Sequence, residues 1–312
     1  MQLNQINLAL RGIAKAHSNQ GKHLITSQIE HKSILATCQA LEQEGFQVTY
    51  LKPNTTGLIT PESIKNALQP DTLLVSIQQI NNETGVIQPI ESIAEILLQN
   101  GVLFHVDAAQ GCGKLPLNLN TTPIDLLSFS AHKFHGPKGI GGLVIRNRRQ
   151  LRLQPLIRGG GQEFGLRAGT LATHQIAGMC TALQLINQTQ KQDTQNIKEL
   201  KHNFLKQLTQ HIQLKVHGEE ANCSPYIVNF SIHGINNDAL INQLQNDVAL
   251  STGSACSSGT IEPSYVLRAM GIEGQQLYGA VRASFCRYHT QNDINFAAKK
   301  ILAAVRRIQD QQ

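Results

Sequence analysis

The sequence contains no tryptophan, and only 4% of its 312 residues are aromatic. Its net charge of +6 could suggest a nucleic-acid partner. However, the basic residues are scattered apart from two clusters at 146–152 and 297–309, and no aromatic residues interleave with them. Scattered basic residues are typical of solvated helix faces rather than of a nucleic-acid surface. We therefore expect no direct contact with nucleic acid.

Long apolar runs and closely paired cysteines are absent too. No apolar stretch is long enough to cross a membrane, and the first residues, MQLNQINLALRG, do not form a secretory signal. A chain of this length buries a large core without disulfides. The six cysteines, without any CxxC pair, indicate reduced thiols in a cytoplasmic globular protein with no resident metal site. They are Cys38, Cys112, Cys180, Cys223, Cys256 and Cys286.

Short apolar runs alternate with helical patterns through the first half of the chain. The runs predict strands at 23–27, 48–51, 73–77, 103–107, 126–130 and 141–146, and the patterns between them predict helices at 33–44, 61–69 and 91–100. This order is typical of an α/β fold with a mostly parallel sheet flanked by helices.

The second half of the chain has a different pattern. A long helical region from about 171 to 215 leads into strands in YIVNFSI, VALST and VRASF and helices at 237–247 and 291–308. We expect a large domain at 1–190 and a smaller C-terminal α+β domain at 191–312.

Polar residues follow the predicted strands of the large domain. Because ligands of open α/β sheets gather beyond the carboxyl ends of the strands, these residues are the candidates for chemistry. They are His31, Asn82, Asp107, Gln110, Ser130, His132 and Lys133.

Lys133 and Asp107 suggest the chemistry most directly. A lysine at a strand end beside Ser130 and His132 suits formation of a Schiff base, although it could also be a surface loop lysine. Asp107 ends an apolar strand and requires a cationic partner, which the protonated pyridine nitrogen of pyridoxal phosphate would provide. The alternative for Asp107 is a cap on the helix-like segment that follows.

Three further assignments stay open on residue type alone. His31 could stack on a cofactor ring or move protons, or it could be structural. Ser130 and His132 could bind a phosphate beside glycine-rich backbone. Arg282 could form a bidentate pair with a substrate carboxylate, or an ordinary salt bridge.

Cys256 lies in STGSACSSGT, a stretch without bulky side chains. Buried cysteines usually have apolar neighbours. A thiol in a segment of small polar residues is therefore a candidate for reactivity and movement.

Seven motifs, in order, resemble one family. EHKSIL, NNETGV, HVDAAQ, SFSAHKFHGPKGIGGL, RAGT, STGSACSSG and EPSYVLRAMG are similar to the cysteine desulfurases of the iron–sulfur-cluster assembly type. These are class V aminotransferases with the fold-type I architecture of pyridoxal-phosphate enzymes. The similarity runs from about residue 7 to the end.

The resemblance implies a role for each matching residue. Lys133 would hold pyridoxal 5′-phosphate covalently, Asp107 would pair with its pyridine nitrogen, and His31 would stack on its ring and assist proton transfers. The remaining contacts would be Gln110 and Asn82 to the ring oxygen, Ser130 and His132 to the phosphate, and Thr170 to the phosphate of the other subunit of a homodimer.

The resemblance also implies the reaction. Arg282, with Asn82 nearby, would bind the carboxylate of L-cysteine. Cys256 would attack the substrate sulfur and keep it as a persulfide, leaving L-alanine. A sulfur-acceptor protein for cluster assembly or tRNA thiolation would follow, and Cys256 could ligate a transferred iron–sulfur cluster.

Two departures from the family pattern stand out. The family's N-terminal segment, with a strand and a phosphate-binding Gly-Ala-Thr turn, has no counterpart here, and Phe164 replaces a commonly basic residue. We expect an N-terminally truncated desulfurase with weakened activity, in which strand 141–146 becomes an edge strand. The alternatives are an inactive scaffold that binds partners, or another class V enzyme such as a selenocysteine lyase or an aminotransferase.

Overall fold

The computed structural model describes residues 2–218, 222–252 and 263–311. The chain forms two compact units. Unit 1 comprises residues 1–52, 59–80 and 88–190, and unit 2 comprises residues 53–58, 81–87 and 191–312. Two early segments thus belong with the later residues, which a single division between 190 and 191 does not anticipate.

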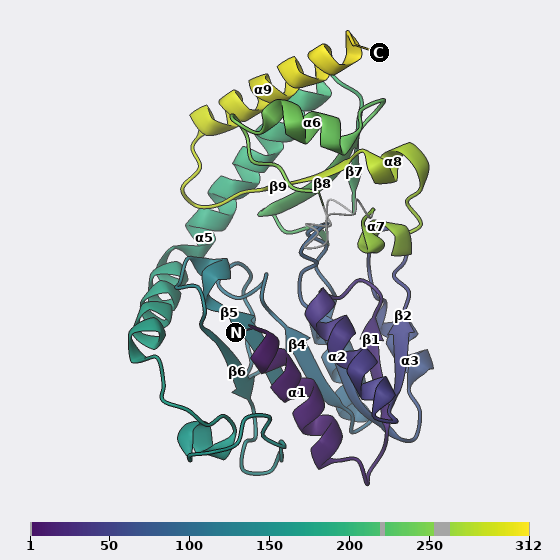
Figure 1. The fold of residues 1–312 in the computed structure, drawn as a ribbon, viewed down its shortest axis with the longest axis vertical. Helices are drawn as coiled ribbons and strands as arrows, with labels where there is room; N and C mark the ends of the chain where they lie inside the picture. The colour runs from purple at the N-terminus through teal and green to yellow at the C-terminus, as the bar shows by residue number, and fades with distance from the viewer. Residues whose placement is uncertain (1, 219–221, 253–262, 312) are drawn as a thin grey trace. The chain divides into compact units, whose positions relative to one another are not determined.

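Unit 1 is built on a six-stranded sheet with the order β2-β1-β3-β4-β5-β6 (Figure 1). The pairs are parallel except for β5 with β6, which is antiparallel. As expected, β6 is an edge strand within the described residues. The strands are β1 (His23–Ser27), β2 (Gln47–Leu51), β3 (Thr72–Gln78), β4 (Leu103–Asp107), β5 (Leu126–Ser130) and β6 (Gly141–Ile145). The helices are α1 (Gln2–Ala16), α2 (Lys32–Gln43), α3 (Pro61–Ala67), α4 (Ile90–Gln99) and the short η1 (Ala131–Phe134) and η2 (Gln162–Gly165).

Apolar side chains cover both faces of this sheet, as a buried parallel sheet requires. On one face, Leu24, Leu74 and Leu126 pack with apolar residues of α1 and α2. On the other face, Val75 and Val106 belong to a cluster that includes residues of α3 and α4. The burial of both faces explains why the strands read as continuous apolar runs, and the predicted strands and helices match the observed ones within a few residues.

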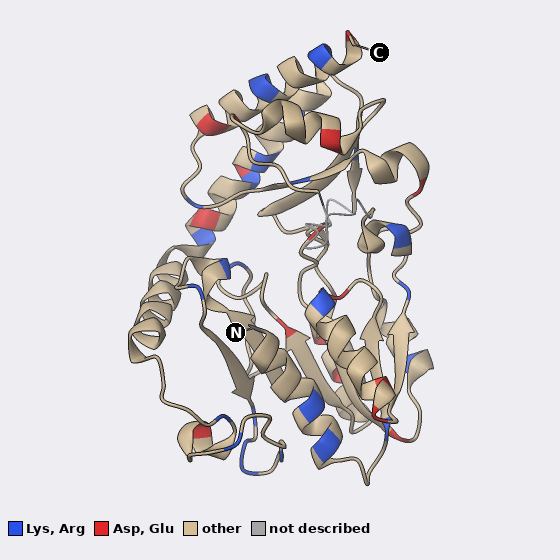
Figure 2. Ribbon diagram, viewed as in Figure 1, with Lys and Arg blue, Asp and Glu red and all other residues tan. Residues whose placement is uncertain are grey.

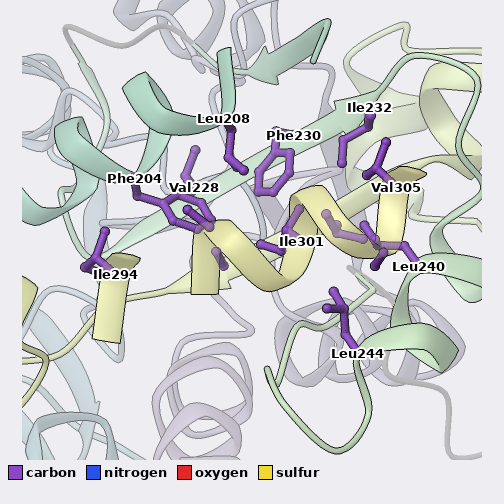
Figure 3. Packing of buried hydrophobic residues seen from close by; sticks show 14 of the residues in the cluster. Phe204, Leu208, Val228, Phe230, Ile232, Leu240, Leu244, Ile294, Ile301 and Val305 are labelled. Atoms are coloured by element: carbon purple, nitrogen blue, oxygen red, sulfur yellow. The ribbon is translucent and has the colours of Figure 1, made fainter. Parts of the chain in front are cut away.

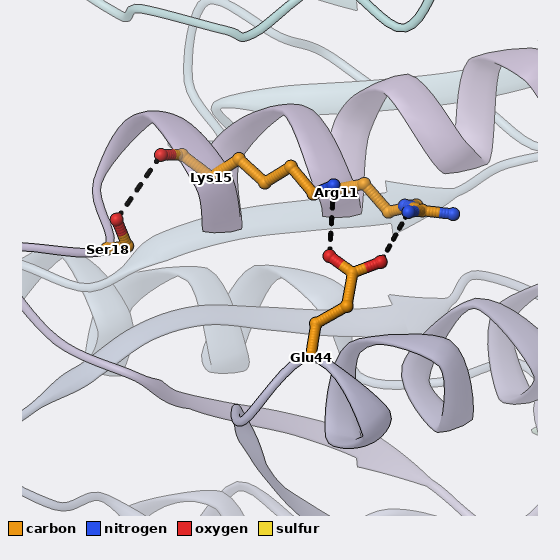
Figure 4. Close-up of polar contacts among 4 residues, drawn as sticks. All are labelled: Arg11, Lys15, Ser18 and Glu44. Atoms are coloured by element: carbon orange, nitrogen blue, oxygen red, sulfur yellow. Dashed lines mark hydrogen bonds and ion pairs between the residues drawn. The ribbon is translucent and has the colours of Figure 1, made fainter.

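Charged residues also join α1 to the end of α2 (Figure 4). Arg11 and Lys15 lie one turn apart on α1, and both form ion pairs with Glu44, at 2.5 and 3.0 Å. All three side chains are partly exposed, so each pair contributes less than about 1 kcal/mol.

Unit 2 contains a three-stranded antiparallel sheet with the order β7-β8-β9. Phe204 and Leu208 of α5, Phe230 of β8 and Ile301 of α9 belong to its buried apolar cluster (Figure 3). The strands are β7 (Leu214–His217), β8 (Ile227–Ile232) and β9 (Ala280–Ser284). The helices are α5 (Thr173–Thr209), which begins in unit 1, α6 (Asn237–Leu244), α7 (Tyr265–Ala269), α8 (Gly274–Tyr278) and α9 (Gln291–Gln309).

Two sequence predictions for unit 2 were wrong. VALST is not a strand, because within the described residues it forms a single isolated bridge, that of Ser251 with Arg282. Residues 214–215 belong to β7 rather than to the long helix, which ends at Thr209. Both errors concern short segments whose hydrogen-bond partners lie far away in the sequence.

The charges are spread over the surface. Figure 2 shows one acidic residue near the start of α9, Asp293, and basic residues further along it; these basic side chains are exposed or partly exposed, in keeping with a solvated helix face. No helix among the described residues is long and apolar enough to span a membrane.

Candidate active site

The carboxyl ends of β1, β4 and β5 carry most of the candidate residues of unit 1. Asp107 is the last residue of β4 and is buried, with 4% of its surface exposed. Its Oδ1 accepts a hydrogen bond from the main-chain N–H of Ala109 at 2.9 Å. The carboxylate therefore caps the turn after β4, as the alternative interpretation expected. This bond fixes the carboxylate at the rim of the sheet.

Lys133 lies in η1, directly after β5. A hydrogen bond from Ala131 N–H to the carbonyl of Ile140 closes the loop, and His135 and Gly139 adopt positive φ angles of 66° and 85°. Glycine adopts such angles without strain, which explains the glycine-rich sequence after the lysine. The turn thereby holds Lys133, which is half-buried, close to the strand end.

His31 is the N-cap of α2. Its Nδ1 accepts from the main-chain N–H of Ser33 at 3.2 Å and lies 2.7 Å from the Ser33 hydroxyl. With Nδ1 as acceptor, the proton of the neutral ring is on Nε2. Reduced hydration lowers the pKa of His31, and the charges of Lys133 and Lys32 lower it further. His31 is therefore a neutral ring that donates through Nε2 near Lys133.

Ser130 and His132, the predicted phosphate ligands, lie beside each other. Ser130 Oγ is 2.8 Å from His132 Nδ1. Loss of hydration lowers the pKa of His132, and the neighbouring positive charge of Lys133 adds to the effect. A buried hydroxyl, an exposed imidazole and glycine-rich backbone meet at this end of β5.

Two other predicted residues of unit 1 have different surroundings. The side chain of Gln110 accepts a hydrogen bond from Lys114 Nζ at 2.9 Å. Thr170 is exposed in the segment before α5, and its role toward another subunit stays a prediction. Phe164 is 73% exposed, and the guanidinium of Arg148 lies 3.7 Å from the centre of its ring.

Asn82 and Arg282 meet in unit 2. Arg282 Nη1 donates to the main-chain carbonyl of Asn82 at 2.9 Å. Burial lowers the pKa of Arg282, and the negative charge of Glu83 opposes that shift. The structure thus brings together the two residues expected to bind a substrate carboxylate. Cys256 lies outside the described residues.

Sequence reasoning missed several buried polar residues. Glu30 is fully buried; its Oε1 accepts from Ser27 Oγ at 2.6 Å and from Gln78 N–H at 3.2 Å. Burial raises its pKa to about 8. Asn229, on β8, is also fully buried. The signal was present, since charged or amide side chains beside apolar strand residues are rarely buried without a role.

Fold and site together define a class of protein. Residues 3–296 match the family model described as aminotransferase class-V, and the chain belongs to this family. Its fold is that of the fold-type I pyridoxal-phosphate enzymes.

Its relatives include named cysteine desulfurases. The chain is 44% identical over 304 residues to "Cysteine desulfurase IscS" of Pseudomonas aeruginosa, an alignment that spans 97% of this chain and 75% of the relative. The same values hold for the protein of that name from Pseudomonas putida.

Solved structures agree. A structure described as a NifS-like protein has a TM-score of 0.90 at 33% identity, covering 97% of this chain and 80% of that one. SspA in complex with cysteine has a TM-score of 0.79 at 35% identity, covering 93% of this chain and 80% of the other.

The residues of unit 1 fit pyridoxal 5′-phosphate, the cofactor of the family. An amine, a buried carboxylate and an imidazole share one rim with hydroxyl donors. Gln79 Oε1 is buried without a hydrogen-bond partner among the described residues. A Cβ on Gly111 would lie only 1.8 Å from that oxygen, so the glycine leaves room for it. A buried acceptor without a partner at this rim is accounted for by a bound group that donates to it.

Proposed function

We propose that the protein is a cysteine desulfurase that converts L-cysteine to L-alanine and transfers the sulfur to Cys256 as a persulfide. The observation that carries the proposal is the joint placement of Lys133, Asp107 and His31 at one sheet edge of a chain 44% identical to cysteine desulfurases. Asp107 supplies a fixed negative charge, Lys133 an amine, and His31 a neutral donor. This is the set of groups that pyridoxal-phosphate chemistry requires.

Each residue has a task that follows from its environment. When bound, the cofactor supplies an electron sink for the α-carbon of the substrate. The Lys133 amine would hold the cofactor and would accept the α-proton of the substrate at Nζ, and Asp107 would provide a compensating negative charge. His31 donates a hydrogen bond from Nε2, because Ser33 occupies Nδ1. In unit 2, Arg282 and Asn82 bind the substrate carboxylate.

The sulfur transfer balances without an external oxidant. The Cys256 thiolate attacks the substrate sulfur, the carbon–sulfur bond breaks, and its electron pair stays with carbon. Protonation of that carbon yields alanine, and the sulfur remains on Cys256 as a persulfide. A later thiol nucleophile of an acceptor protein takes the sulfur and regenerates the cysteine.

The proposal extends to the oligomeric state, the partner and the cellular compartment of the enzyme. We propose a homodimer, since exposed Thr170 is available to a second subunit, and a sulfur-acceptor protein that serves cluster assembly or tRNA thiolation. We also propose the cytoplasm, because the five described cysteines are thiols and a reducing compartment preserves them.

The test is sulfide release from L-cysteine by the purified protein supplied with pyridoxal phosphate and a reducing thiol. Lys133→Ala should lower kcat by about 10³-fold or more, and borohydride should fix the coenzyme on Lys133 in the wild-type chain only. Cys256→Ala should abolish persulfide formation while the coenzyme still binds. Lys138→Ala, an exposed lysine five residues away, is the matched control.

Three outcomes distinguish the proposal from its alternatives. Coenzyme labelling of Lys133 without turnover of cysteine would indicate a scaffold. Turnover that does not depend on Cys256 would indicate another class V activity. Absence of labelling would contradict the proposed site itself.

A further inference from the structure

The three-stranded sheet of unit 2 has one apolar and one polar face. Side chains alternate along a strand, so Val228 and Phe230 face the apolar cluster while Asn229 faces the other way. Asn229 pairs in register with Arg282 of β9 and with His217 of β7, so all three side chains share the polar face. Asn229 has no exposed surface, and His217 is 3% exposed.

Part of this polar face is fully hydrogen-bonded. Ser231 Oγ donates to the carbonyl of Gln276 at 2.5 Å and lies 2.6 Å from His217 Nε2. Because the hydroxyl proton is used on the carbonyl, the imidazole N–H donates to the hydroxyl. Burial lowers the pKa of His217 to about 4, so the ring is neutral. These residues are structural.

The neighbouring part of the same face has unused polar atoms. Asn229 Nδ2, Asn229 Oδ1, Arg282 Nε and Asn82 Oδ1 are buried and lack hydrogen-bond partners among residues 2–218, 222–252 and 263–311. Arg282 links the group, since its Nη1 donates to the Asn82 carbonyl. Buried polar atoms without partners are rare in native proteins, and each requires an explanation such as a bound ligand, an ion or a water molecule.

We propose that Asn229 and Arg282 together form the subsite for the carboxylate of the amino-acid substrate. A carboxylate accepts hydrogen bonds from the Asn229 amide and from the guanidinium, and Asn229 Oδ1 is then the acceptor available to Arg282 Nε. Each unused atom of the two side chains finds a partner in this way. The inference rests on the proposed function and adds Asn229 as a specificity-determining residue.

The first test separates ligand binding from structure. The probe is 3-mercaptopropionate, which has the carboxylate and thiol of cysteine but no amine, and its Kd for the coenzyme-loaded protein is measured by calorimetry. Asn229→Ala should weaken binding about 10- to 100-fold, the loss of one hydrogen bond to a charged group. Its melting temperature should fall less than that of Ser231→Ala, because the amide has no hydrogen-bond partner to lose among the described residues.

Ser231→Ala is the matched control on the same strand and face. It removes a hydroxyl that is hydrogen-bonded to His217 and to the carbonyl of Gln276, so the melting temperature should fall while the Kd of the probe stays within about twofold. If both residues were structural, both variants would lower the melting temperature and neither would selectively weaken binding of the probe.

A second variant tests the charge of the ligand. Asn229→Asp places a carboxylate beside Arg282. This change should weaken the binding of 3-mercaptopropionate by at least about 100-fold. Cysteamine, which lacks the carboxylate, should inhibit this variant and the wild-type enzyme with similar strength. A comparable loss for both compounds would overturn a carboxylate subsite.

Three further outcomes separate failure of this inference from failure of the proposed function. If wild-type protein turns over cysteine and Asn229→Ala leaves both the KM and the probe affinity unchanged, the inference is wrong and the proposed function stands. If Asn229→Ala lowers the melting temperature as Ser231→Ala does, Asn229 is structural. If wild-type protein neither binds the probe nor turns over cysteine, the proposed function fails first.

Discussion

The sheets of the two units carry buried polar side chains on one face, but they use them differently. In unit 1, the ring nitrogens of His105 lie 2.9 Å from Ser76 Oγ and 3.1 Å from Ser128 Oγ. In unit 2, Asn229 is buried as completely as His105, yet neither of its side-chain polar atoms has a described partner. A buried polar residue with its bonds complete builds the scaffold, whereas one with bonds unused points to a ligand.

The position of each group in the sheet supports this contrast. His105 lies two residues before Asp107 on β4 and on the same face, so the Ser76–His105–Ser128 bridge holds three strands in register beneath the site. Asn229 lies opposite the residue expected to bind substrate. The first group positions the site, and the second belongs to it.

The largest expected effect comes from breaking the hydrogen bonds of His105 in unit 1. His105→Leu keeps an apolar ring-sized volume but leaves the hydroxyls of Ser76 and Ser128 buried without their partner. We expect a loss of about 2–4 kcal/mol in the free energy of unfolding, measured by urea denaturation. The kcat of the folded fraction should change little.

A compensated variant controls for simple volume effects. Adding Ser76→Ala and Ser128→Ala to His105→Leu removes the orphaned hydroxyls and should restore part of the stability, because apolar replacement of all partners is nearly neutral. A triple variant less stable than His105→Leu alone would show that the bridge is not what stabilises the three strands.

The next effect concerns Glu30, whose carboxyl is buried with its pKa raised to about 8. Between its ordinary pKa of 4.5 and 8, the folded protein retains a proton that the unfolded chain has released. The contribution of Glu30 to stability is therefore complete below pH 4.5 and is lost as the pH rises through 8, by up to about 1.4 kcal/mol per pH unit.

Glu30→Gln cannot titrate and keeps an oxygen for Ser27 and Gln78. We expect similar stabilities at pH 5 and a variant that is more stable than wild type by about 2–4 kcal/mol at pH 8, measured by denaturation at each pH. Glu95→Gln, at an exposed position, should show no such pH-dependent difference. Parallel pH profiles for Glu30→Gln and wild type would contradict a neutral, buried Glu30.

The sequence predicted the fold of unit 1 well because its strands are buried on both faces and its helices are amphipathic. It placed Lys133, Asp107 and His31 at one edge because parallel strands end together. The resemblance placed Asn82 near Arg282, but the predicted domain division did not place residues 81–87 in unit 2, since they join it through contacts with residues more than 130 positions away, such as Val86 with Cys223. Sequence reasoning also overlooked Asn229, since a single amide in an apolar strand has no periodic signal.

A smaller effect is expected from a change in the polar group of unit 2, at Arg282. Arg282→Lys keeps a positive charge but loses Nε and the planar fork that binds a carboxylate through two bonds. We expect the KM for cysteine to rise about tenfold with a much smaller change in kcat, measured by initial rates of alanine formation. A fall in kcat at constant KM would instead place Arg282 in the chemical step.

The smallest effect tests how unit 1 fixes the proton of His31. Ser33→Ala removes the hydroxyl 2.7 Å from Nδ1 and keeps the main-chain N–H that donates to the same atom. Two donors to Nδ1 favour the neutral ring, so losing one should raise the pKa of His31 by less than about one unit. Titration of the ring Cε1 proton by NMR measures it, with the partly exposed Ser63→Ala in α3 as control. A lower pKa in Ser33→Ala would mean that Nδ1, rather than Nε2, carries the proton, and His31 would then present an acceptor to the site.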